Sequence, residues 1–178
     1  MEYKIIRHHR RKSILITVCP TGEVTVKAGI LTSDRRIEEF VNSKKAWIEK
    51  QQKYFAAKFH HRITVTEEEK ETLRKQLLPV MKELVEKYSS VMGVEPSGVK
   101  ITSAEKRWGS RSGKKSVCFS YRAALVSDRC REYLAVHELS HLKHMDHSDR
   151  FYACVEKYMP DYKEAEKELD GYYIHLRK

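Results

Sequence analysis

Residues 137–147 read His-Glu-Leu-Ser-His-Leu-Lys-His-Met-Asp-His, and this stretch indicates both the chemistry and the fold of the chain. His137 and His141 lie four positions apart, so on a helix they project from one face, one turn apart. Two imidazoles placed in this way can hold one zinc ion, and the carboxylate of Glu138 can then reach a metal-bound water as general base. The pattern is typical of a zincin active site and predicts a zinc-dependent hydrolase with an open position for water.

The third protein ligand is chosen by where the helix ends. His147 follows six residues after His141 and can reach the metal only if the chain leaves the helix soon after His141; metzincins with this spacing have glycine at the position of His144. If the helix continues, His144 lies about 10 Å along the axis from His137, and three nearly collinear ligands suit tetrahedral zinc poorly. Glu156, on the following helix, is the alternative ligand in the gluzincin manner. The spacing favours His147 and leaves Glu156 and His144 as alternatives.

The positive charge of the chain is concentrated in its first third. The 178 residues carry a formal net charge of +10, and residues 1–62 hold 14 basic and 6 acidic side chains, which leaves +2 for the rest. Such an excess favours an anionic partner such as nucleic acid, although it also serves solubility. The basic surface is therefore expected away from the histidine motif.

The cysteines and the hydropathy pattern indicate an intracellular protein. The four cysteines are widely scattered without a C-x-x-C pair, which favours free thiols over a disulfide framework or a second metal site. The apolar run at residues 14–19 is too short for a signal peptide, and no stretch approaches the roughly 18 apolar residues of a membrane span. We expect a cytoplasmic protein with no membrane partner, and a monomer. The cysteines are Cys19, Cys118, Cys130 and Cys154.

The N-terminal third predicts β-strands followed by a helix. Segments 3–8 and 13–19 are rich in β-branched residues, and a Pro-Thr-Gly-Glu turn at 20–23 leads into a third alternating segment. Ser33 has the features of an N-cap that opens one long helix. We therefore expect residues 1–62 to form a basic module of β-strands plus a helix.

The remainder of the chain predicts a second helical and β region. Thr66 and Glu69 form a capping box that opens a helix, which Pro79 is expected to kink or interrupt. Strands are expected at 99–102 and 116–121, and Asp128, Ser148 and residues 162–169 mark the later helices, the last of which ends the fold. The predicted class is α+β and zincin-like, with a small antiparallel sheet packed on an active-site helix and preceded by an N-terminal β-hairpin region and a long helix. Residues 63–178 would be the zincin-like metallopeptidase domain.

Four stretches of sequence belong together: Arg107–Ser110, Tyr133–Leu142, Asp146–Ser148 with Phe151, and Tyr158–Tyr162. In combination they resemble the YgjP-like family of predicted metal-dependent hydrolases, which is related to the SprT-like and wider zincin peptidases. The resemblance spans nearly the whole chain, because it also includes the basic run and the Gly22 turn of the N-terminal part. Arg111 departs from it, since cysteine is frequent at that position, and this departure affects the substrate-facing sheet.

The resemblance implies His137, His141 and His147 as metal ligands and Glu138 as catalytic acid/base, in agreement with the spacing. We therefore expect a metallopeptidase with one Zn²⁺ per chain and a polypeptide substrate. The alternatives are a nucleotide phosphohydrolase or a protease that acts on nucleic-acid-bound proteins through the basic N-terminal part, and a non-catalytic binding module with a closed four-ligand metal site.

The residues of the substrate cleft are not identified by pattern. Arg107 and Trp108 either line the cleft or have structural roles, with the structural roles slightly favoured. Tyr152 is one of ten tyrosines that could reach an oxyanion, so the sequence gives little reason to choose it.

Overall fold

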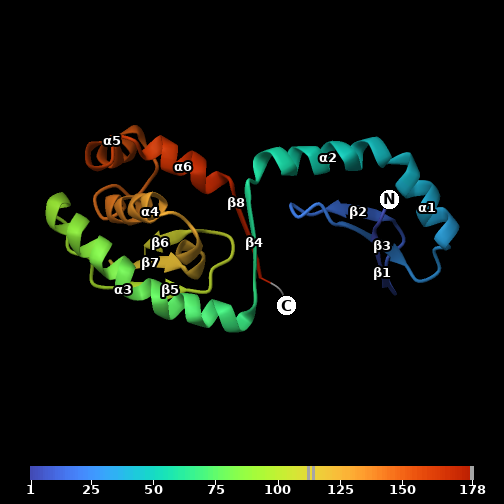
Figure 1. Ribbon diagram of the computed structural model, residues 1–178, viewed down its shortest axis with the longest axis horizontal. Coiled ribbons are helices and arrows are strands. Elements are labelled where there is room, and N and C mark those ends of the chain that lie inside the picture. Colours follow the sequence, from blue (N-terminus) through green and yellow to red (C-terminus); the bar gives the residue numbers. More distant parts are fainter. Residues whose placement is uncertain (112, 114, 177–178) are drawn as a thin grey trace. The chain divides into compact units, whose positions relative to one another are not determined.

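The computed structural model of the protein describes residues 1–111, 113 and 115–176, and the chain divides into two compact units, residues 1–62 and 63–178. Each unit has a core of its own. Helices and small sheets occur in both, which confirms the predicted α+β class (Figure 1). Among the described helices, none is both long enough and apolar enough to cross a membrane.

A three-stranded sheet forms one layer of the N-terminal unit. β2 and β3 are antiparallel, as the predicted hairpin requires, whereas β1 runs parallel to β3. The order of the strands is β1-β3-β2, with bounds Lys4–His8 for β1, Leu15–Val18 for β2 and Val24–Gly29 for β3.

Two helices, and not the single long helix expected from the sequence, cover this sheet: α1 (Asp34–Ser43) and α2 (Lys45–Lys58). At Lys44 the backbone leaves helical geometry, and its N–H donates to the carbonyl of Val41 at 3.0 Å, which tightens the last turn of α1. The break lets both helices turn apolar side chains onto one core with the sheet. That core consists of Val18, Val24, Val26, Ala28, Ile37, Val41 and Ile48.

The C-terminal unit contains the sheet that was expected between residues 99 and 121, but the sheet is mixed and not antiparallel. The chain places β5 at one edge and β6 at the other, then returns through the middle as β7, so that β7 is parallel to β5 and antiparallel to β6. β6 is therefore an edge strand. The bounds are Val99–Thr102 for β5, Gly109–Arg111 for β6 and Val117–Ser120 for β7.

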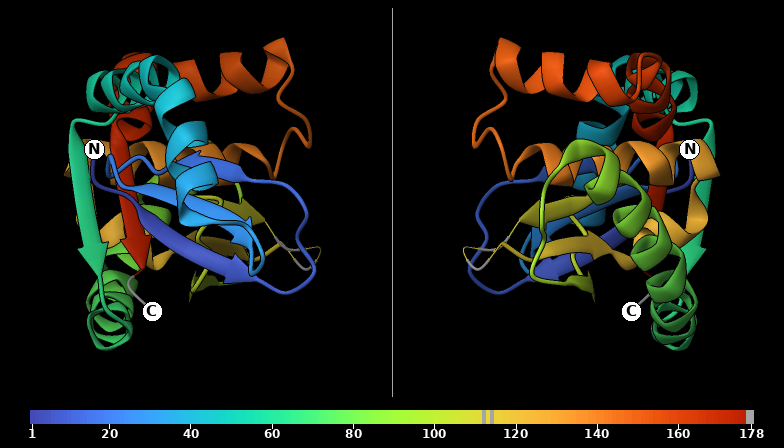
Figure 2. Two further views of the ribbon diagram at one scale, coloured as in Figure 1. Left: turned by 90° about the vertical axis from the view of Figure 1, so that its right-hand side faces the viewer. Right: turned by 90° about the vertical axis from the view of Figure 1, so that its left-hand side faces the viewer.

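The helix α4 (Asp128–Ser140) is the central element of this unit. It contacts β6 and β7 on one side and α5 (Asp149–Tyr158) and α6 (Tyr162–Asp170) on another, as Figures 1 and 2 show. The long helix α3 (Glu67–Met92) packs against both α4 and β5. Because α4 is enclosed on several sides, apolar residues occur around most of its circumference, and eight of its thirteen residues are buried.

Of three further expectations about this unit, two need correction and one is confirmed. Of the two effects expected of Pro79, interruption of the helix is wrong: α3 continues through Pro79, and Leu77 and Met81 are buried on either side of it. The N-cap of α4 is Ser127 and not Asp128, since the Ser127 hydroxyl accepts from the N–H of Cys130. The capping box at Thr66 is confirmed.

The fold also does not end with the last helix. A strand β8 (Tyr172–Leu176) follows α6 and pairs with β4 (His61–Val65) in a two-stranded sheet. Both strands went unrecognised in the sequence, although Ile174 and Leu176 are buried and His175 between them is exposed, the alternation of a half-buried strand.

Candidate metal centre

The last turns of α4 present two of the predicted ligands. His137 and His141 are one helical turn apart, and the centroids of their rings lie 5.0 Å from each other. Both side chains are partly buried. α4 ends at Ser140, with His141 as its C-cap residue, so the second histidine marks the point at which the chain leaves the helix.

A turn after α4 returns the third histidine to the first two. The ring of His147 lies 5.1 Å from that of His137 and 4.7 Å from that of His141. The Nε2 atoms of His137 and His147 are 3.1 Å apart, and one ligand atom from each of the three imidazoles lies within 4.8 Å of the others. Three imidazole nitrogens at this separation suit one tetrahedral metal ion with a position left for a non-protein ligand.

The turn forms without the glycine that metzincins have at the position of His144. Among the described residues, Lys115 is the only non-glycine with positive φ, so His144 keeps an ordinary backbone. The N–H of His144 instead donates to the carbonyl of Ser140 at 2.9 Å, which closes the turn. The carbonyl of His144 has a second role, because it accepts from Nδ1 of His141 at 3.2 Å. This bond leaves Nε2 of His141 as the unprotonated nitrogen, as a metal ligand requires.

Phe151 of α5 is the surface against which the three imidazoles pack. Its ring centroid lies 4.9 Å from that of His137, 4.5 Å from that of His141 and 4.8 Å from that of His147, and the residue is fully buried. The sequence motif included Phe151, but spacing alone did not reveal that it contacts all three rings.

Electrostatics keep the first imidazole neutral. Burial, together with the neighbouring His141 and His147, lowers the pKa of His137 to about 3. A neutral ring retains the lone pair that binds a metal, and the residues present therefore fit a zinc ion.

Glu138 is almost fully buried beside this cluster, with an exposure of 4%. Burial raises the pKa of its carboxyl group to about 8, and the positive charge of Arg107 opposes that rise. Its Oε2 atom has no hydrogen-bond partner among the described residues. A buried, unpaired carboxylate oxygen next to a ligand cluster is unusual in a purely structural role and is characteristic of functional sites.

Gly109 of β6 provides the space that Glu138 occupies. A Cβ atom at Gly109 would lie 2.3 Å from Oε1 of Glu138 and 2.8 Å from its Cδ. No side chain larger than hydrogen fits between this strand and α4 without displacing the carboxylate. Gly109 belongs to the Trp-Gly-Ser motif, but the motif alone does not indicate this contact.

A cleft of about 380 Å³ opens onto the cluster. Arg107 lines it, whereas Trp108 stacks against the guanidinium of Arg122 at 4.1 Å and so has the structural role that the sequence slightly favoured. Arg111 also lines the cleft and donates to the carbonyl of His141 at 3.3 Å. The ring centroid of Tyr152 lies 6.2 Å from that of His147, but Tyr152 is not among the described residues that line the cleft.

The other ligand candidates do not join the cluster. Glu156 is exposed on α5, and the group of converging ligand atoms found among the described residues contains neither Glu156 nor His144. A closed four-ligand site built from these residues therefore has no support in the geometry.

Comparison with known proteins shows which family the sequence belongs to. The sequence matches the YgjP-like family, described as a YgjP-like metallopeptidase domain, over residues 12–72 and 64–172. The chain belongs to the YgjP-like family. The resemblance inferred from the motifs is thus confirmed, and this YgjP-like chain is a metallohydrolase of a metallopeptidase family.

Two solved structures are similar to part of the YgjP-like chain. One is the metallopeptidase zymogen of Pyrococcus abyssi abylysin, at 25% identity and a TM-score of 0.46. The other is the metallopeptidase zymogen of Methanocaldococcus jannaschii jannalysin, at 21% identity and a TM-score of 0.43. Each match covers 50% of this chain and 90% of the other. No curated protein matches the sequence.

The choice between His147 and His144 can be tested by metal content. We expect His147→Ala to lower zinc affinity by at least tenfold, because two imidazoles on one helix leave the ion poorly coordinated. His144→Ala is the matched control, since its backbone carbonyl, and not its side chain, contacts His141. Zinc titration with a competing chromophoric chelator measures both variants. Equal losses, or a loss confined to His144→Ala, would contradict the assignment.

Proposed function

We propose that this chain is a zinc-dependent peptidase in which His137, His141 and His147 hold one zinc ion. The observation that carries the proposal is the convergence of three imidazoles beside a buried carboxyl group in an open cleft. When bound, zinc supplies a Lewis acid that acidifies a water molecule and polarises the carbonyl of the substrate.

Glu138 acts as the general base in this proposal. Its carboxylate takes a proton from the attacking water and then donates it to the leaving amine. Burial holds the pKa of Glu138 near 8 in the protein alone, and a divalent cation nearby favours the charged carboxylate, which moves that pKa down. Gly109 allows the carboxylate to lie at this place, so the base is positioned by the sheet as well as by its own helix.

The edge strand β6 provides a place for an extended peptide. Within the part of the chain that the structure describes, β6 pairs on one side only, with β7, and its residues Gly109, Ser110 and Arg111 line the cleft. An extended chain can add to such an edge through main-chain hydrogen bonds, which brings its scissile bond beside α4. We propose that residues 63–178 form the catalytic domain, because every residue of this site lies within them.

The charge of the cleft suggests which peptides it prefers. Of the described residues that line the cleft, Arg107 and Arg111 are cationic and Glu138 alone is acidic. Peptides with Asp or Glu near the scissile bond would complement this charge.

Peptide-library profiling tests the proposal. The zinc-loaded protein is expected to cleave a mixed peptide library, with enrichment of acidic residues near the cut, and a zinc chelator should abolish cleavage until zinc is restored. Mass spectrometry identifies the products. Nucleoside triphosphates form the second arm of the assay, because the alternative hypothesis is a nucleotide phosphohydrolase. Hydrolysis of nucleotides without any peptide product would overturn the peptidase assignment.

A further inference from the structure

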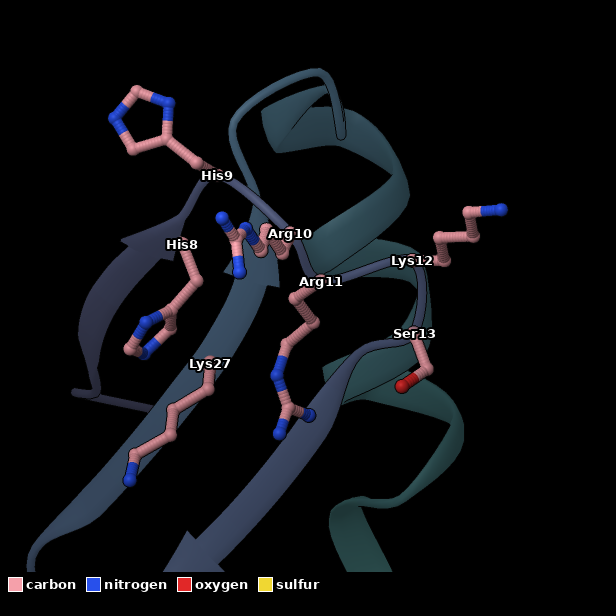
Figure 3. A pocket seen from close by; sticks show the side chains of 7 residues that line it. All are labelled: His8, His9, Arg10, Arg11, Lys12, Ser13 and Lys27. Atoms are coloured by element: carbon pink, nitrogen blue, oxygen red, sulfur yellow. The ribbon is translucent and has the colours of Figure 1, made fainter.

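A second, strongly cationic site lies in the N-terminal unit, on residues that the catalytic proposal does not use. Its cavity of about 710 Å³ is formed by the end of β1, the loop that joins β1 to β2, and the middle of β3. Figure 3 shows the side chains of His8, Arg11 and Lys27 on the same side of the sheet, with His9 and Lys12 directed outward. We call this set the basic pocket: His8, His9, Arg10, Arg11, Lys12, Ser13 and Lys27.

The positive charges of the basic pocket are not neutralised within the protein. Among the described residues, none of Arg10, Arg11, Lys12 and Lys27 forms an ion pair. By contrast, Arg7 on the same strand β1 pairs with the carboxylate of Asp34. The basic pocket also contains no acidic side chain, so its cations remain available to an external anion.

The loop that carries these cations is held in place by β3. A Cβ atom at Gly29 would lie 2.3 Å from the carbonyl oxygen of Arg11. The loop therefore packs against the backbone of β3 at a position where only glycine leaves room for it. Arg7 fixes the same corner, because its guanidinium donates to the carbonyl of Gly29 at 3.0 Å, to that of Thr32 and to Asp34. The backbone that carries the cationic side chains is therefore held in one conformation by these contacts.

We propose that the basic pocket binds the phosphate backbone of nucleic acid without sequence preference. Its lining is cationic or polar throughout: its rings are the imidazoles of His8 and His9, and it offers no aliphatic side chain and no Trp or Tyr of the kind that anchors peptide interfaces. It also lacks Phe, Tyr or Trp for stacking on bases. Cationic side chains and a hydroxyl can bind phosphate oxygens through ion pairs and hydrogen bonds. Contacts to phosphates carry no sequence information.

Fluorescence anisotropy of the full chain with a labelled single-stranded DNA of mixed sequence tests this proposal. For four phosphate contacts, log K should fall with log of the salt concentration with a slope of about −3. Arg10→Ser/Lys12→Ser removes two exposed cations, and we expect roughly tenfold weaker binding with a slope smaller in magnitude by about 1.4. A DNA of different sequence should bind with the same affinity.

Two further variants separate the basic pocket from general charge. Lys50→Ser/Lys53→Ser removes the same charge from exposed positions of α2 and should leave the salt slope unchanged. Gly29→Ala removes no charge but displaces the loop at Arg11, and it should weaken binding as well. Thermal melting followed by circular dichroism verifies that each variant is folded.

The proposal is overturned if both double variants weaken DNA binding equally, or if Gly29→Ala binds DNA like the wild type while folded. Tighter binding of a polyglutamate peptide of equal charge would also overturn it and would indicate an acidic polypeptide partner instead. Because the assay measures binding and needs no turnover, its result does not depend on the peptidase assignment. Peptide hydrolysis by Arg10→Ser/Lys12→Ser should remain at the wild-type rate.

Discussion

Glu138→Gln is expected to retain zinc and to lose about 10²–10⁴-fold in peptide turnover, the usual contribution of a general acid–base group. The amide has the shape of the carboxylate, so it still fits beside Gly109, but it cannot accept the proton of the attacking water. The three imidazoles are untouched. The measurement is kcat on a cleavable peptide from the library, together with the zinc content of the purified variant.

Glu156→Gln provides the matched control for this result. Glu156 is exposed on α5, so the same chemical change there should alter neither zinc binding nor turnover. Turnover at the wild-type level in zinc-loaded Glu138→Gln would exclude Glu138 as the base. Loss of zinc from that variant would indicate a direct role for Glu138 as a ligand.

Gly109→Ala should lower kcat by about 100-fold, because a misplacement of a catalytic group by about 1 Å can have this effect. The added methyl group would lie 2.3 Å from Oε1 of Glu138 and 2.9 Å from its Cγ, so the carboxylate must move. The backbone itself is not the obstacle, since Gly109 does not have positive φ. The measurements are kcat and the zinc content of the variant. The zinc content should equal that of the wild type.

The matched control for this variant is Gly113→Ala in the segment that follows β6. Gly113 also lines the cleft, but an added Cβ there meets no atom within 4 Å. Gly113→Ala should therefore keep turnover within about twofold of the wild type, the small effect usual for a surface substitution. If both glycine variants lose turnover equally, or neither does, Glu138 is not positioned by Gly109.

The candidate site was the part of the molecule most accessible from the sequence. Zinc chemistry restricts ligand type and spacing so strongly that His137, His141 and His147 could be named before any fold was known, and the structure brings their ligand atoms together. The roles of these residues stay predictions until metal binding and turnover are measured. What spacing could not reveal are contacts between segments far apart in the chain, such as Gly109 against Glu138.

The fold was predicted well where local signals dominate. The capping box at Thr66 and the hairpin of β2 and β3 depend on neighbouring residues, and both were found. The errors arose where tertiary packing decides. Pro79 does not interrupt α3, because buried neighbours hold the helix together. The parallel pairing of β5 with β7 depends on a chain crossing that has no local signature.

β6 is only three residues long, and in the proposed complex this brevity would govern product release. Main-chain pairing with an edge strand holds substrate and product alike, so a long edge would retain the cleaved peptide and slow the enzyme without lowering the barrier to bond cleavage. A short edge supplies few such bonds. It also gives a second chain little to pair with, which protects the open cleft from edge-to-edge aggregation.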